Sequence, residues 1–115
     1  MQIQAGIGSG HYELAWSYIL DFENTANPLE ERRSEIQKWE TLASVFAVET
    51  PEILKMMEEH TAVGFKPLDA LHIACARALA CEFFLTVDKG VLKKAKAVSA
   101  VRIMNPVEFV FEQGL

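Results

Sequence analysis

Three carboxylates stand at positions where an acid needs an explanation: Glu23, Asp69 and Asp88. Asp69 lies at the start of KPLDALHIACARALA, residues 66–80, which reads as a helix that is apolar on nearly all sides. Such a helix belongs in a protein interior. An acid in the first turn ordinarily offsets the exposed N–H groups there, an effect worth about 0.3–1 kcal/mol. That ordinary role and a functional role both remain open for Asp69.

The other two acids also have ordinary explanations. Glu23 shares a helical arc with Ile19 and Phe22, and a Glu at the edge of a core commonly reaches solvent or pairs with an Arg. Asp88 follows the apolar run FFLTV, so it can cap the next helix, a contribution of about 0.5–2 kcal/mol. Asp88 also follows a strand, however, and open α/β sheets bind ligands at the carboxyl ends of their strands.

Taken together, the three acids indicate a more specific chemistry. Carboxylates gathered without matching bases repel one another unless they are protonated or bound to a cation. Ligands that are all oxygen atoms suit Mg²⁺ or Mn²⁺. Such ions activate water and stabilise the charge of a phosphodiester under attack. The acids therefore favour metal-assisted phosphoryl chemistry, which spacing alone does not establish.

The elements that must position these acids alternate between strand and helix patterns, which is typical of an α/β fold with a parallel sheet. We predict strands over 12–16, 44–48, 83–87 and 101–104, and helices over 17–26, 28–43, 51–63, 66–80, 88–97 and 105–113. Ser17, Thr50 and Asp88 are expected to start helices, and Gly64 to stop one. The whole chain, 1–115, reads as a single domain with a loop or irregular start over 1–11.

The side chains expected to face the core follow from the same patterns. In the charged helix 28–43 the inward residues are expected to be Leu29, Ile36, Trp39 and Leu42. Trp16 and the seven Phe residues are also expected in the core. The short basic segment after Asp88 carries Lys89, Lys93, Lys94 and Lys96. These lysines could contact phosphates, although a basic last turn of a helix is the commoner explanation.

Composition narrows the class of protein. Half of the residues are hydrophobic and 23% are charged, which indicates a globular chain. Acids outnumber bases 16 to 11, which argues against a broad basic face that binds nucleic acid but does not exclude a small metal-bearing site. The two cysteines, Cys75 and Cys81, are too few for a disulfide framework. With no signal peptide and no apolar run near the ~20 residues of a membrane span, we expect a cytoplasmic protein without a membrane partner.

A family resemblance is carried by PLDALHIACARALACEFFLTVDKGVLKKA, which is similar to the C-terminal half of PIN domains. These are metal-dependent ribonucleases that include many toxins of bacterial toxin–antitoxin systems. The matching pieces are the Asp-Ala-Leu-His start at Asp69 and the Thr-x-Asp strand end from Thr86 to Asp88. WSYILDFEN resembles the family's stretch that ends in the helix acid, here Glu23, and RIMNPVEFV resembles its last strand and helix.

The resemblance implies a fold and a reaction. The fold would be a three-layer α/β/α sandwich around a parallel sheet. Glu23, Asp69 and Asp88 would hold Mg²⁺ or Mn²⁺, and a metal-activated water would hydrolyse an RNA phosphodiester. Thr86, by its position, is expected to support the acids. His72 could orient Asp69 or the substrate, or it could be a histidine at the core edge that is satisfied by hydrogen bonding.

One departure from the family leads to a second functional hypothesis. PIN domains begin with a strand that ends in an Asp, and MQIQAGIGSGHYELA supplies neither. By the resemblance this is an N-terminally truncated PIN-like domain, and the loss of one carboxylate weakens the binding of a hard cation. The alternative is therefore a catalytically inactive PIN-like module that acts through dimerisation or by binding an antitoxin-like partner. Such a module would be expected as a homo-oligomer, because exposed apolar surface must be covered.

Overall fold

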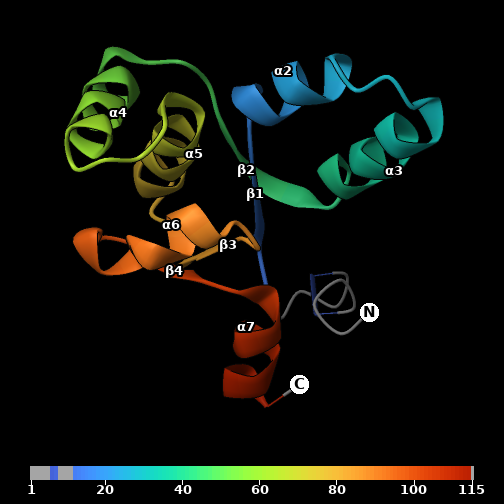
Figure 1. Cartoon of the computed structure of the whole chain (residues 1–115). Helices are drawn as coiled ribbons and strands as arrows, with labels where there is room; N and C mark the ends of the chain where they lie inside the picture. Colours follow the sequence, from blue (N-terminus) through green and yellow to red (C-terminus); the bar gives the residue numbers. More distant parts are fainter. Residues whose placement is uncertain (1–5, 8–11, 115) are drawn as a thin grey trace.

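A computed structural model of the chain describes residues 6–7 and 12–114. Most of the start expected over 1–11 therefore lies outside the described residues. The elements, in chain order, are β1 (Leu14–Ser17), α2 (Tyr18–Thr25), α3 (Glu30–Glu40), β2 (Ala43–Ala47), α4 (Pro51–Ala62), α5 (Pro67–Ala78), β3 (Phe83–Leu85), α6 (Lys89–Lys93), the 3₁₀ turn η1 (Ala95–Ala97), β4 (Arg102–Met104) and α7 (Pro106–Gln113) (Figure 1).

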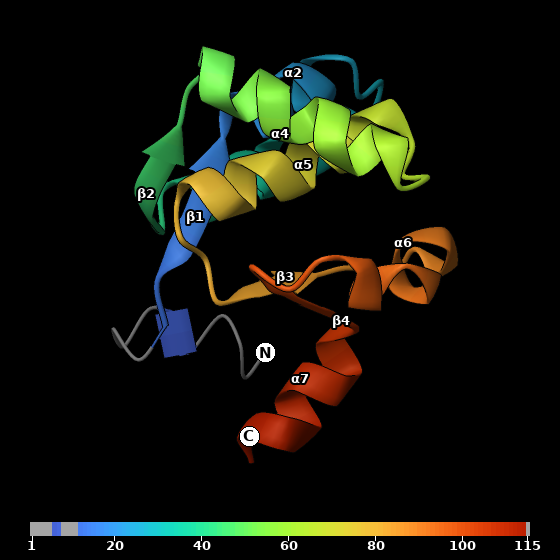
Figure 2. The same cartoon turned by 90° about the vertical axis from the view of Figure 1, so that its left-hand side faces the viewer.

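The strands form two separate parallel pairs. β1 pairs with β2, placing Trp16 opposite Phe46, and β3 pairs with β4, placing Phe84 opposite Ile103. The prediction of a mixed α/β fold with parallel strands is confirmed, but the single sheet expected at the centre of a three-layer sandwich is replaced by two small ones. Figure 2 shows β1 and β2 on one side of α5 and the β3–β4 pair below it. Within the described ranges, no strand joins β1 to β3.

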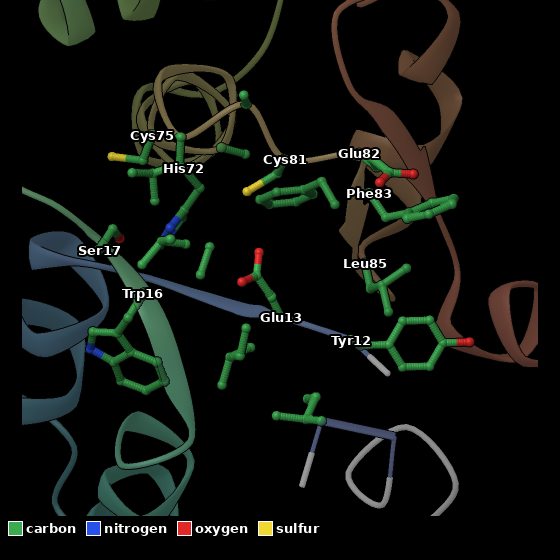
Figure 3. Close-up of a pocket in the computed structure, with 18 of the residues that line it drawn as sticks. Tyr12, Glu13, Trp16, Ser17, His72, Cys75, Cys81, Glu82, Phe83 and Leu85 are labelled. Atoms are coloured by element: carbon green, nitrogen blue, oxygen red, sulfur yellow. The ribbon is translucent and has the colours of Figure 1, made fainter. Parts of the chain in front are cut away.

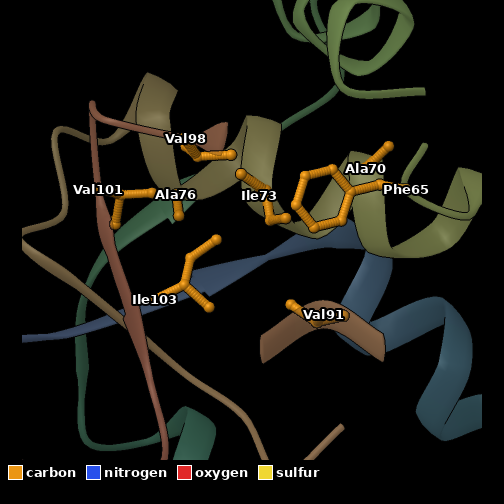
Figure 4. Packing of buried hydrophobic residues seen from close by; sticks show 8 residues of the cluster. All are labelled: Phe65, Ala70, Ile73, Ala76, Val91, Val98, Val101 and Ile103. Carbon is orange, nitrogen blue, oxygen red and sulfur yellow. The ribbon is translucent and has the colours of Figure 1, made fainter. Parts of the chain in front are cut away.

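Helix α5 supplies residues to both parts of the buried core. One face contributes Ala70, Ile73 and Ala76 to a cluster with Phe65, Val91, Val98, Val101 and Ile103 (Figure 4). The other face contributes Leu71, Ala74 and Cys75 to a cluster with Ile19, Ala47 and Ile53. Helix α4 packs alongside α5. The prediction of an interior helix is confirmed for residues 70–76, which are buried apart from His72. The two ends of the predicted range are exposed, at Lys66, Pro67, Leu68, Ala78 and Ala80.

Several helix ends follow the expected local chemistry. The Thr50 side chain accepts a hydrogen bond from the backbone N–H of Ile53, and Asp88 does the same for Val91. Gly64 follows the end of α4 and has a φ of +107°, which lies in the left-handed region that glycine favours after a helix. Ser17 occupies the N-cap position of α2 but makes no capping hydrogen bond, so its predicted capping role is wrong.

The prediction of which side chains face the core is only partly correct. Helix α3 begins at Glu30 and contains no buried residue; Leu29 is exposed, while Ile36, Trp39 and Leu42 are half-buried. Trp16 is buried as predicted, but Phe22, Phe46 and Phe111 are exposed. These phenylalanines lie on outer faces of α2, β2 and α7, where the described part of the chain places no second layer over them. Neither the spacing of apolar residues nor their type shows whether another layer of structure covers a given face.

Candidate functional site

The clearest long-range polar contact among the predicted site residues joins Glu23 and His72. Glu23 Oε1, from α2, lies 2.6 Å from His72 Nε2, from α5, although the residues are 49 positions apart in the chain. The His72 side chain is 16% exposed and that of Glu23 is 42% exposed. Of the arc expected to surround Glu23, Ile19 is buried, but Phe22 is 66% exposed. The contact fixes the carboxylate of α2 against the N-terminal half of α5.

Asp69 lies one turn before His72 on α5. Residues three apart on a helix share a face, so Asp69 projects from the same side of α5 as the histidine that holds Glu23. Asp69 is half-buried and occupies the first turn, where a negative charge is stabilised by the helix N-terminus. The fold thus brings Glu23 into contact with the face of α5 that His72 shares with Asp69.

Asp88 is held by local backbone contacts. Its Oδ1 accepts a hydrogen bond of 3.0 Å from the N–H of Val91, which confirms the ordinary N-cap role. The N–H of Asp88 in turn donates to Oγ1 of Thr86 at 3.1 Å. Thr86 therefore contacts Asp88, the acid that it was expected to support, through the backbone of that residue.

The three acids do not gather into one metal site in this structure. Within residues 6–7 and 12–114, no group of three or more His, Cys, Asp or Glu side chains could hold a metal ion. The physical reason is the divided sheet: Glu23 follows β1 and Asp88 follows β3, and the carboxyl ends of strands converge only when the strands share a sheet. The arrangement as it stands does not fit a Mg²⁺ or Mn²⁺ ion held by all three acids.

A cavity that the sequence did not predict lies between the two strand pairs. Its volume is about 830 Å³, and it is lined by residues of β1, α5, β3 and α7. Figure 3 shows His72 and Cys75 on α5 above β1, and the carboxylate of Glu13 directed into the space below Cys81. Burial raises the pKa of the Cys75 and Cys81 thiols. A side-chain hydrogen bond with Ser17 acts on the pKa of Cys75 in the opposite direction.

A second, polar cavity of about 510 Å³ lies between α2 and α3. Its lining residues are Asp21, Asn24, Thr25, Arg33, Gln37 and Glu40. Trp16 Nε1 donates to Asp21 Oδ1 at 2.9 Å. Loss of surrounding water and then the neighbouring Asp21 carboxylate raise the pKa of Glu40. Asn24 is buried, and its amide donates to the carbonyl of Arg33.

Comparison with known proteins identifies the family. The sequence profile described as PIN domain matches residues 11–97. The chain belongs to the PIN domain family. The match includes Glu23, Asp69 and Asp88, and it confirms the resemblance on which the sequence interpretation relied. No significant match was found among curated proteins or among solved structures.

The family profile does not extend to the last part of the chain. It ends before β4 and α7 of this PIN domain, so the likeness of RIMNPVEFV to a final strand and helix stays a prediction. Cys75 and Cys81 are both free. In the part of the PIN domain that the structure describes, no helix is long and apolar enough to cross a membrane.

Proposed function

We propose that this PIN domain is a ribonuclease that hydrolyses RNA phosphodiester bonds with Mg²⁺ or Mn²⁺, using Glu23, Asp69 and Asp88. Membership of the PIN family supports the reaction class, since such ions typically serve this family. The observation that supports the assignment is the contact between Glu23 and His72, which joins one proposed acid to the helix that carries Asp69. When bound, the ion would supply an activated water and neutralise phosphate charge.

The residues of the chain have separate roles in this proposal. His72 is a positioning residue: its ring, largely buried, holds the Glu23 carboxylate in place. Asp69 and Asp88 are the other two proposed acids, although the three acids do not form one metal-binding group in the described residues. The exposed lysines that follow Asp88 would contact the RNA backbone, because phosphate contacts position a nucleic acid without reading its sequence. They are Lys89, Lys93, Lys94 and Lys96.

The test is cleavage of a labelled single-stranded RNA in Mn²⁺, with and without EDTA. Asp88→Asn is the sharpest variant, because Asn caps a helix as well as Asp does and only the charge is lost. Glu23→Gln and Asp69→Asn remove the other acids, and Glu58→Gln, at an exposed site on α4, is the matched control. We expect cleavage to vanish in EDTA and in the three site variants, and to persist in Glu58→Gln.

The positioning role of His72 has its own readout. His72→Gln should lower the cleavage rate by roughly 10-fold or more, as loss of supporting hydrogen bonds around metal ligands does. Calorimetric titration with Mn²⁺, without RNA, should show weaker binding in the same variant. Cleavage that resists EDTA and all three acid substitutions would come from a contaminating nuclease and would contradict the proposal.

A second function is favoured by the separation of the acids in the described residues. In that case the chain is a catalytically inactive PIN-like module that dimerises or binds an antitoxin-like protein. A folded chain that neither cleaves RNA nor takes up Mn²⁺ would support this alternative. Sedimentation velocity would then show whether the module associates with itself.

A further inference from the structure

Polar contacts join helix α3 to α2 and to the turn between them. The two helices follow one another as the arms of a hairpin (Figure 1). Asn24 Nδ2 donates to the carbonyl of Arg33 at 3.2 Å, and Arg33 Nη1 donates to the carbonyl of Asn27 at 2.6 Å. Helix α3 contains no buried residue, and a helix without an apolar face gains little from hydrophobic burial. A ligand that bridges the two helices through polar groups would therefore add to the stability of α3.

The polar cavity between these helices brings two carboxyl groups together. Asp21 of α2 and Glu40 of α3 both line the cavity, and their side chains lie within hydrogen-bond reach of each other. Two ionised carboxylates this close repel one another unless they share a proton or bind a cation. Glu40 is also the last residue of α3, and the negative end of a helix dipole favours a cation. This end of the cavity therefore attracts positive charge.

The basic residue in the described lining does not neutralise the carboxyl pair. Arg33 precedes Glu40 by seven positions on α3, which corresponds to about 10 Å along the helix axis. Its guanidinium donates to the carbonyl of Asn27, in the turn between the helices. Trp16 Nε1 does donate to Asp21 Oδ1 at 2.9 Å, but an indole N–H carries no formal charge.

A third oxygen atom in the cavity lacks a partner. Asn24 is 8% exposed and lines the cavity, and the hydrogen bond to the carbonyl of Arg33 directs its amide group towards α3. Its Oδ1 is shielded from solvent and accepts no hydrogen bond from the described residues. Such an oxygen carries a desolvation penalty that a bound ligand would remove. Because Asn24 follows Asp21 by three positions on α2, the two side chains share a helix face.

The oxygen donors determine the kind of ion that would fit. Two carboxylates and an amide oxygen suit a hard cation, and the described lining contains no Cys or His. Ca²⁺ accepts carboxylate, amide and water oxygens in a flexible geometry, whereas Mg²⁺ requires a nearly ideal octahedron. Donors from two separate helices suit the more flexible ion. The volume of about 510 Å³ leaves room for the waters that would complete its coordination.

We propose that the cavity between α2 and α3 is a Ca²⁺ site whose ligands are Asp21, Glu40 and Oδ1 of Asn24. The ion neutralises the paired carboxylates, gives the amide oxygen a partner and ties α3 to α2. All three ligands belong to one hairpin of the chain, residues 18–40. Asp21 and Glu23 are two positions apart on α2 and do not share a helix face. None of the acids of the proposed nuclease lines this cavity, so either proposal can fail without the other.

Luminescence of Tb³⁺, which takes the place of Ca²⁺ among oxygen ligands, tests the site in the whole chain. Excited tryptophan transfers energy to Tb³⁺ only at short range, and the Trp16 indole contacts Asp21. We expect saturable Tb³⁺ emission on tryptophan excitation, and its displacement by Ca²⁺. Asp21→Asn with Glu40→Gln should weaken Tb³⁺ binding about tenfold or more. This pair of substitutions removes a like-charge contact, so the metal-free variant should remain folded.

Two control variants separate this site from other acids. Glu23→Gln with Asp88→Asn removes two acids of the proposed nuclease and should keep the saturable emission. Glu35→Gln with Glu58→Gln makes the same change of charge at exposed positions outside the cavity lining, and it should also leave the emission unchanged.

Thermal melting gives a second readout without Tb³⁺. Ca²⁺ should raise the denaturation temperature of the parent chain, because an ion that binds only the folded state stabilises it. The same concentrations of Ca²⁺ should not raise the denaturation temperature of the variant that carries both Asp21→Asn and Glu40→Gln. Asn24→Ala should reduce the affinity for Tb³⁺ about threefold or more, with circular dichroism to verify that the variant is folded.

Three results would overturn the proposal. Tb³⁺ binding of equal affinity in the parent chain and in the variant with Asp21→Asn and Glu40→Gln would place the ion elsewhere. Loss of the emission in the variant with Glu23→Gln and Asp88→Asn would assign the ion to the acids of the proposed nuclease. Absence of saturable emission from the parent chain would show that water or a shared proton, and no cation, satisfies the groups in the cavity.

Discussion

Replacing Ile73 by alanine tests the packing of α5 most directly. Ile73 is 0% exposed and lies in the cluster that joins α5 to β4 and α6. The substitution removes three carbon atoms, worth about 0.8 kcal/mol each in transfer free energy, and leaves a cavity. Because large-to-small changes of this kind cost 2–5 kcal/mol in total, we expect the free energy of unfolding to fall by about 3–4 kcal/mol.

Urea unfolding followed by tryptophan fluorescence measures this loss, since Trp16 is buried. With a denaturant slope of about 1.5 kcal/mol per molar, the midpoint should fall by roughly 2 M. Ile73→Val should cost about 1 kcal/mol and serves if the alanine variant does not fold. Leu68→Ala, on the same helix but 47% exposed, is the control and should cost less than half as much as Ile73→Ala. Equal losses for Ile73→Ala and Leu68→Ala would refute the buried placement of Ile73.

Three further predictions concern single groups. Burial, and then the nearby Arg77, lower the pKa of His60 in the folded chain, so protonation of His60 favours the unfolded chain. The free energy of unfolding should be full above pH ~6.5 and should fall as the pH drops below that value through the folded pKa. Thermal melts at successive pH values should show this dependence, and His60→Gln should lose part of it. Thr50→Ala removes the cap on Ile53 and should cost about 1 kcal/mol in urea unfolding, whereas Thr50→Ser should cost little. Gly64→Ala places a Cβ at φ of +107° and should lower stability by about 1 kcal/mol or more, a loss that Gly64→Asn would partly avoid; unchanged melting of the alanine variant would contradict the left-handed turn.

The helices could be predicted because their signals are local. Thr50 and Gly64 mark the ends of α4 by rules that act within one turn. The near absence of a polar face on 66–80 predicted an interior helix, and α5 is buried on two sides. Which strands pair is a long-range property, and no residue in β1 or β3 indicates that, within the residues the structure describes, the second edge of its strand is unpaired.

In the candidate site, too, the local contacts could be predicted from the sequence and the long-range contacts could not. Asp88 as a helix cap follows from its own neighbourhood, and the structure confirms it. The contact of Glu23 with His72 depends on how α2 crosses α5, so residue spacing could only suggest that both matter. Phe22 and Phe111 were expected inside because of residue type, yet Phe111 is 88% exposed. Residue type gives the tendency to be buried, while exposure depends on whether another layer is present.

The shared use of α5 by two cores has a consequence for cooperativity. Ala70, Ile73 and Ala76 face one cluster, while Leu71, Ala74 and Cys75 face the other. A helix of 12 residues is marginal without tertiary packing, so melting of either core would remove support from the helix on which the other depends. The two halves are thereby coupled through a single helix, although their sheets are divided. Calorimetry should accordingly record one heat-absorption peak instead of two.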